Sequence, residues 1–183
     1  STDHPFELSV AMLTATGVDG ASLAQATEGL DLLEIPYSSG SDANSALVGG
    51  HCDLYVCGWD DIAGLVESGD IVPILALCEN RMSIAPDLQC SVENGIDSVM
   101  GPWRGIFAKK GTPLEAIDTL VAAIEEAKQS DTWKEFTHNA AYDERPIPAP
   151  GEETAEFCHN EYKDLHDYMV EQGTLVKDYD DLK

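Results

Sequence analysis

The sequence predicts an α/β fold with a mainly parallel sheet and helices on both faces. Along the first hundred residues, short apolar runs alternate with stretches of helical periodicity, which is the rhythm of βαβ units. The chain has 183 residues and is 43% hydrophobic, enough for one core, or for one core plus a smaller packed segment. Disorder is therefore not expected.

Four apolar runs are interpreted as strands: Leu8 to Leu13, Leu32 to Pro36, Asp53 to Cys57 and Ile71 to Leu77. Helices are expected between them, over Ala21 to Glu28, Asp42 to Val48 and Asp60 to Glu67. Asp60 is expected to be the N-cap of the third helix. Right-handed connections bring the loops at the carboxyl ends of the strands to one edge, where ligands bind in open α/β sheets.

The segment from Asn80 to Pro102 is expected to be irregular, because prolines and glycines recur there. The domain boundary is placed near Met100, which divides the chain into residues 1–100 and 101–183. The second part is expected to contain a strand, a helix, a short helix, a strand and a last helix over 152–172, with Gly173 as the C-cap of the last helix. One face of the last helix carries Cys158, Tyr162, Leu165 and Met169.

The second part begins with a junction from Trp103 to Pro113, WRGIFAKKGTP, in which a strand-like run meets a helix start. Thr112 is expected to be the N-cap, Pro113 suits the first helical position, and Glu115 completes a Thr-x-x-Glu capping box. The helix is expected from about Pro113 to Gln129. Its apolar face carries Ile117, Leu120, Val121 and Ile124.

A second motif combines Ile35-Pro36-Tyr37, the loop Ser38-Ser39-Gly40, and the series from Ala46 to Asp53. In order and spacing, this motif and the junction resemble the TctC/Bug family, the periplasmic solute-binding proteins of tripartite tricarboxylate transporters. The resemblance runs from about Glu7 to Gly173, with Lys109 where the family often has proline. It implies a fold like that of type II periplasmic binding proteins. Family members begin with a half-domain that is absent here, so the second lobe is expected to be incomplete, with an apolar surface left partly uncovered.

The charge of the chain excludes one large class of partners. Thirty-four acidic residues against ten basic ones give a formal net charge of −24, which repels nucleic acids and anionic membrane surfaces. We interpret this charge as a solvated acidic surface. The sequence shows no bilayer-spanning run and no signal peptide. A periplasmic location is therefore implied by the resemblance alone.

Neither metal nor cofactor is expected. The five cysteines follow no zinc or redox spacing, and they are interpreted as buried thiols, with a disulfide between Cys78 and Cys90 left open. His159 and His166 could share a helix face, but two surface histidines need no metal to explain them. No nucleophile motif is present. Catalysis is therefore the weaker class, and a thiol enzyme would require a reactive cysteine such as Cys57 or Cys158.

The loop from Thr14 to Ser22 is the main candidate for a ligand site. Its small residues let backbone amides approach a ligand, and a helix N-terminus favours an anion. The resemblance implies a carboxylate held by Thr16, Gly17, Gly20, Ala21 and Ser22. Asp19 departs from this pattern: it either caps the helix or indicates a ligand that also bears an amine or hydroxyl. The alternative interpretation is an ordinary turn and cap.

Further candidates lie on the same edge. Ser38 and Ser39 would offer hydroxyl and amide contacts, and Asp60 lies beside them on the third loop. Trp59 either forms a cleft wall or covers the core. Trp103 either lines the hinge side of the cleft or packs the domain seam.

The sequence thus predicts a receptor rather than an enzyme. Its expected ligand is a small organic carboxylate, and its expected partners are the membrane permease subunits of the transporter. The alternative is a stand-alone interaction or sensor module that forms a homodimer through residues 101–183.

Overall fold

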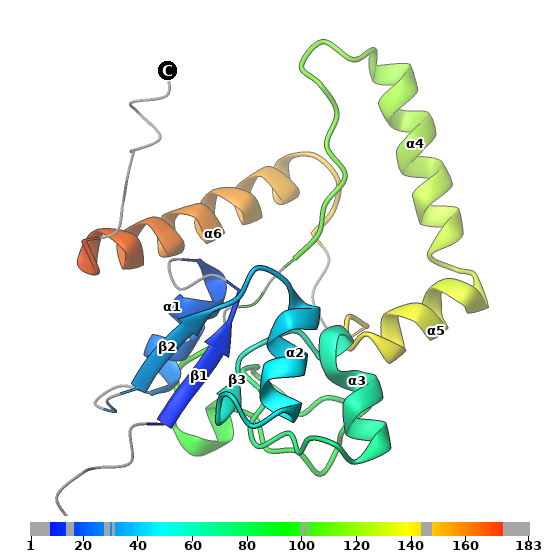
Figure 1. The fold of residues 1–183 in the computed structure, drawn as a ribbon. Coiled ribbons are helices and arrows are strands. Elements are labelled where there is room, and N and C mark those ends of the chain that lie inside the picture. The colour runs from blue at the N-terminus through cyan, green and yellow to red at the C-terminus, as the bar shows by residue number, and fades with distance from the viewer. Residues whose placement is uncertain are drawn as a thin grey trace, which may run out of the picture.

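The computed structural model describes residues 8–13, 17–27, 30, 32–99, 101, 103–143 and 148–173. Its centre is a three-stranded sheet of β1 (Leu8–Met12), β2 (Leu32–Pro36) and β3 (Leu54–Tyr55). The strands are parallel and lie in the order β2-β1-β3 (Figure 1). The predicted parallel α/β architecture is confirmed.

Six α-helices and one 3-10 helix occur in the described chain: α1 (Val18–Ala26), α2 (Gly40–Val48), α3 (Trp59–Ser68), η1 (Val92–Asn94), α4 (Leu114–Ala127), α5 (Asp131–Asn139) and α6 (Glu152–Glu171). The first three begin earlier than predicted. For α1 the difference is three residues, because the Gly17 carbonyl already accepts the first helical hydrogen bond, from the Ala21 amide at 3.0 Å. The predicted end of α1 at Glu28 lies outside the described residues.

The core lies on both faces of β1, the central strand. Side chains alternate along a strand, so Val10 and Met12 face one side and Ala11 faces the other. Val10 and Met12 pack with Leu23 of α1. On the opposite face, Ala11 packs with Ala43, Ala46 and Cys52, of which the two alanines belong to α2. A buried strand between two helical layers is what a parallel sheet requires.

Two predicted strands are wrong. Residues 71–77 are irregular apart from Ala76, which forms a single parallel bridge with Cys90. Pro73 has no amide hydrogen and cannot continue a ladder there. The run from Trp103 to Ala108 is also not a strand, and its apolar side chains include Ile106, 81% exposed. A strand needs a neighbour to accept its hydrogen bonds, and the described residues provide none at that place.

The predicted irregular segment is confirmed, and polar side chains tie it down. The buried Ser91 hydroxyl donates to the carbonyl of Ser98 at 2.6 Å, and the Ser98 hydroxyl donates to the carbonyl of Ser22 in α1 at 3.0 Å. No disulfide joins Cys78 and Cys90, so the pairing left open by the sequence is not formed. Because buried polar groups need partners, these hydrogen bonds hold the loop against α1.

The second half of the chain is more open than the first. Figure 1 shows α4 standing away from the sheet, whereas α6 packs against α1. Thr112 does not cap α4: its hydroxyl donates to the carbonyl of Lys109 at 2.8 Å, and Pro113 takes the N-cap position. The predicted C-cap of the last helix is one residue too late: Gln172 is the C-cap of α6, and Gly173 follows it with a left-handed φ of +66°. The second strand predicted for this half would fall between α5 and α6, where residues 144–147 lie outside the described residues.

Candidate functional site

Three helices begin at the carboxyl edge of the sheet. β1 is followed by α1, β2 by α2 and β3 by α3, and the strands are parallel, so the three helix starts lie on one edge (Figure 1). The first amides of each helix have no partner inside the helix, and the helix dipole places partial positive charge there. Backbone geometry alone therefore makes this edge suitable for an anion.

At the first helix start, Gly17 is the N-cap, with an extended ψ of −157°. The amides of residues 18–20 precede the first helical hydrogen bond and have no acceptor within the helix. Gly20, Ala21 and Ser22 lie inside α1 and are buried, so the interpretation of them as loop residues is corrected. Thr16 lies outside the described residues.

At the second helix start, Ser39 is the N-cap and its hydroxyl accepts from the Asp42 amide at 3.2 Å. Ser38 is exposed beside it. A Cβ atom on Gly40 would lie 3.3 Å from Oδ1 of Asp61 and 3.6 Å from the hydroxyl oxygen of Tyr55. Glycine at this position thus lets the start of α2 pack closely against the third helix start.

At the third helix start, Gly58 is the N-cap, and the prediction that Asp60 would be the cap is wrong. Asp60 and Asp61 both lie in the first turn of α3. Burial and the neighbouring Asp60 carboxylate raise the pKa of Asp61, whereas Arg104 and the Gly58 backbone lower it. The net shift of the Asp61 pKa is upward, chiefly because burial disfavours the charged carboxylate, and the adjacent Asp60 carboxylate adds to the effect.

The same edge also carries the carboxylates of Asp19, Asp60 and Asp61. Burial raises the pKa of the Cys57 thiol to about 12, with Asp61, Asp19 and Asp60 adding to the effect. Burial likewise raises the pKa of Tyr55, with further contributions from these carboxylates and Cys57. A nucleophilic cysteine needs a lowered pKa, so this environment disfavours thiol catalysis.

Asp60 belongs to a cluster of three side chains that sequence reasoning missed. The Tyr142 hydroxyl donates to Oδ2 of Asp60 at 3.0 Å, and Nη1 of Arg104 donates to the Tyr142 oxygen. Nη2 of Arg104 lies 3.6 Å from Oδ2 of Asp60, and the guanidinium carbon lies 5.6 Å from the centre of the Tyr142 ring. The position of Arg104 in the junction motif could have marked it as a candidate site residue, whereas nothing in the sequence around Tyr142 indicated a role.

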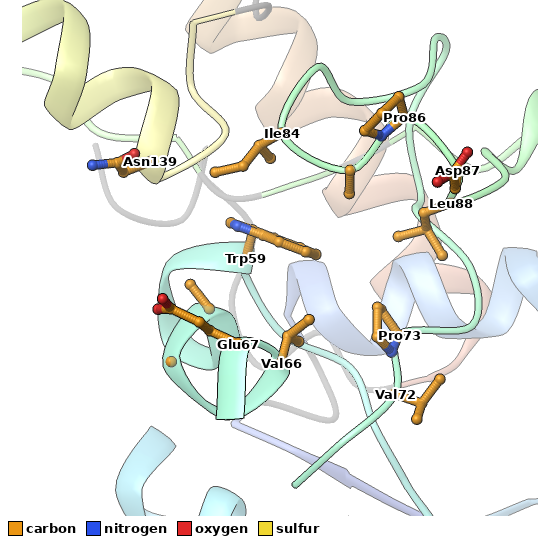
Figure 2. A pocket seen from close by; sticks show the side chains of 13 residues that line it. Trp59, Val66, Glu67, Val72, Pro73, Ile84, Pro86, Asp87, Leu88 and Asn139 are labelled. Carbon is orange, nitrogen blue, oxygen red and sulfur yellow. The ribbon is translucent and has the colours of Figure 1, made fainter. Parts of the chain in front are cut away.

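Trp59 lies in a pocket of about 820 Å³ between α3 and residues 84–88 (Figure 2). Its ring faces apolar side chains that include Val66, Pro73 and Leu88. The indole Nε1 is buried and has no hydrogen-bond partner among the described residues. Trp59 therefore lines this pocket, and its role in the wall of a ligand cleft stays a prediction.

Trp103 contacts the last helix, since its ring meets Phe157 of α6 edge-on with centroids 5.5 Å apart. It also packs against Phe107 at 6.2 Å. These contacts favour the seam interpretation of Trp103 over the cleft interpretation.

Within the described residues, no group of three or more histidine, cysteine, aspartate or glutamate side chains is placed to hold a metal. His166 instead pairs with Asp167 at 3.1 Å. None of the helices in the described ranges has both the length and the apolar character needed to cross a bilayer. The sheet edge therefore offers amide donors, hydroxyls and carboxylates.

Curated relatives match most of this chain. A UPF0065 protein of Bordetella pertussis is 27% identical over 121 residues, which cover 66% of this chain and 38% of the relative. BugT of the same organism is 27% identical over 156 residues, which cover 85% of this chain and 47% of the relative. The chain therefore spans less than half of the length of these relatives.

Solved structures share the fold. A periplasmic transporter protein matches with a TM-score of 0.77 at 22% identity over 95% of this chain and 58% of its own. An adipate-bound protein of R. palustris matches with a TM-score of 0.72 at 18% identity, over 93% and 56%. MatC from Rhodopseudomonas palustris with bound malate matches with a TM-score of 0.67 at 23% identity, over 87% and 56%. The model of the tripartite tricarboxylate transporter family receptor, TctC, matches residues 9–172. The chain belongs to this family of receptors.

Proposed function

We propose that the chain forms the ligand-binding part of a solute receptor, which takes a small organic carboxylate at the carboxyl edge of its sheet. The observation that carries this proposal is the convergence of three helix starts on one edge. Membership of a receptor family supports binding over catalysis. The malate and adipate bound to two structural neighbours support a carboxylate.

The ligand carboxylate would lie against Gly17 and the first backbone amides of α1, and Thr16 is proposed to contribute from the preceding loop. Gly20 would contribute its backbone amide, whereas Ala21, whose amide donates to the Gly17 carbonyl, and Ser22 would contribute only by forming the first turns of α1. Ser38 and Ser39 would form a second wall. Trp59 and Asp60 would complete the third side at the start of α3.

Residues 1–100 would then carry the site, and residues 101–183 would belong to a second lobe. The two lobes of such a receptor close around the ligand, because the ligand contacts both only in the closed state. The closed form would be delivered in the periplasm to the permease subunits of a tripartite transporter.

Isothermal titration calorimetry with malate and adipate tests the proposal. The matched controls are the corresponding diamides, which keep the carbon skeleton and lose both charges. We expect heat of binding from at least one dicarboxylate and none from its diamide. Equal binding of acid and diamide, or binding of neither, would overturn the carboxylate assignment.

A second candidate function is self-association through residues 101–183. Leu114 of α4 is 76% exposed, and Phe107 before it is 71% exposed. Exposed apolar surface of this kind usually marks an interface. The net charge of −24 opposes association, so added salt should strengthen a dimer by screening repulsion. Sedimentation velocity at two salt concentrations tests this: a monomer at both, with no binding of a hydrophobic dye, would exclude it.

A further inference from the structure

Arg104 is held at the ligand edge by groups from two other parts of the chain. Asp60 comes from the first turn of α3, and Tyr142 follows α5. The guanidinium is fixed by the hydrogen bond from Nη1 to the Tyr142 oxygen and by its stacking on the Tyr142 ring. An arginine fixed in this way loses less conformational freedom when it binds a further group.

Most of the donors on Arg104 remain available. A guanidinium has five N–H donors, and within the described part of the chain the Tyr142 oxygen is its one hydrogen-bond acceptor. The 3.6 Å separation of Nη2 from Asp60 exceeds hydrogen-bonding distance. The Arg104 side chain is 70% exposed. Its planar fork is therefore open to a second carboxylate, which is the partner that matches its geometry.

The charges around the site make such a cation necessary. Asp19, Asp60 and Asp61 all lie close enough to raise the pKa of Cys57. Each helix start offers only about half an elementary positive charge. A ligand carboxylate at this edge would therefore meet net repulsion without a full positive charge nearby. Arg104 provides this positive charge, with Nη2 3.6 Å from Oδ2 of Asp60. It also opposes the upward shifts in the pKa values of Asp61 and Tyr142.

We infer that Arg104 is a further ligand-binding residue, whose guanidinium receives a carboxylate of the ligand while Asp60 and Tyr142 hold it in position. This inference rests on the proposed function, because it concerns the same site. It adds a charged contact from residues 101–183 to a site otherwise built from the first hundred residues. It also makes the ligand bridge the two parts of the chain.

Three variants of the 183-residue chain test the inference. Arg104→Gln removes the charge, Arg104→Lys keeps the charge but loses the fork, and Lys109→Gln removes one charge from the same exposed segment. Calorimetric titrations with malate and adipate, at ionic strength matched with sodium chloride, give the affinity of each. Amide NMR spectra establish that every variant is folded.

Arg104→Gln should weaken dicarboxylate binding about tenfold or more, as expected for a lost hydrogen bond to a charged group. Arg104→Lys should fall between it and the unmodified chain. Lys109→Gln should change affinity by less than about twofold, as a surface substitution does. Equal losses in Arg104→Gln and Lys109→Gln, or no loss in either, would overturn the inference while leaving the proposed function standing. If the unmodified chain binds neither acid, the proposed function fails, and the inference fails with it.

Discussion

Removing one hydroxyl from each of two tyrosines should change stability in opposite directions. The Tyr55 hydroxyl is buried without a hydrogen-bond partner among the described residues, whereas the Tyr142 hydroxyl bonds to both Asp60 and Arg104. Phenylalanine keeps the ring in each case and deletes only the oxygen. The pair Tyr55→Phe and Tyr142→Phe therefore isolates the difference between an unsatisfied and a satisfied hydroxyl.

The magnitudes follow from the environments. An unsatisfied buried polar group costs about 1–3 kcal/mol, and some of this is offset by the contacts that the oxygen makes, so Tyr55→Phe should raise the free energy of unfolding by about 1 kcal/mol. Tyr142→Phe should lower it by about 0.5–1.5 kcal/mol, because its bonds involve charged groups but lie partly in solvent. In a chain of this size, 1 kcal/mol corresponds to about 2–4 °C in melting temperature.

Urea unfolding followed by circular dichroism measures both changes, and thermal melts provide a second readout. A destabilisation of about 1 kcal/mol or more in Tyr55→Phe would show that its hydroxyl has a partner that stabilises the fold. Such a partner would have to lie near Gly40 and Asp61, which surround the Tyr55 hydroxyl at the sheet edge.

Three other predictions concern pH, thiol chemistry and metal. The Ser9 hydroxyl and amide donate to Oδ2 of Asp53 at 2.6 and 2.9 Å, and these hydrogen bonds lower the pKa of Asp53 from 3.8. The unmodified chain should therefore be more stable than Asp53→Asn above pH 3.8. This advantage should be lost as the pH falls through the lowered pKa of the folded state. An advantage that persists in urea melts below that pH would contradict this assignment. The Cys57 thiol, with its pKa raised to about 12, should react with iodoacetamide much more slowly in the folded than in the urea-unfolded chain at mildly alkaline pH, and equal rates by mass spectrometry would revive a thiol enzyme. EDTA should leave the melting temperature unchanged, because no side chains in the described part of the chain are grouped to hold a metal. A clear fall in melting temperature would show that folding requires a metal.

The sequence was sufficient to predict β1 and β2 because each carries its own signals, whereas the strand predicted from Asp53 to Cys57 is only Leu54–Tyr55. Each is a short apolar run bounded by turn residues, and the observed ends differ by at most one residue from those expected. The run from Ile71 to Leu77 has the same composition but pairs only at Ala76. Apolar composition records the tendency to be buried, whereas a strand also requires a neighbour with free hydrogen-bonding groups, and no local pattern encodes that.

The candidate site divides in the same way. The edge itself was predictable, because parallel topology fixes where the helix starts must lie. The exact starts were not, since Gly17 and Gly58 take cap positions that capping preferences assign first to serine, threonine, aspartate and asparagine. The cluster of Asp60, Arg104 and Tyr142 depends on contacts between residues 82 positions apart in the sequence. Such contacts are set by tertiary packing, which no spacing rule reports.

The central claim is that a carboxylate binds where the first helix begins at the sheet edge. Two-dimensional amide NMR spectra, recorded during titration with malate against a sodium chloride blank, test it most directly. We expect the largest shift changes in the amides of Val18, Asp19 and Gly20, because these residues form the first turn of α1, at the positive end of its dipole. Changes confined to parts of the chain away from the sheet edge, such as α4, would contradict the claim.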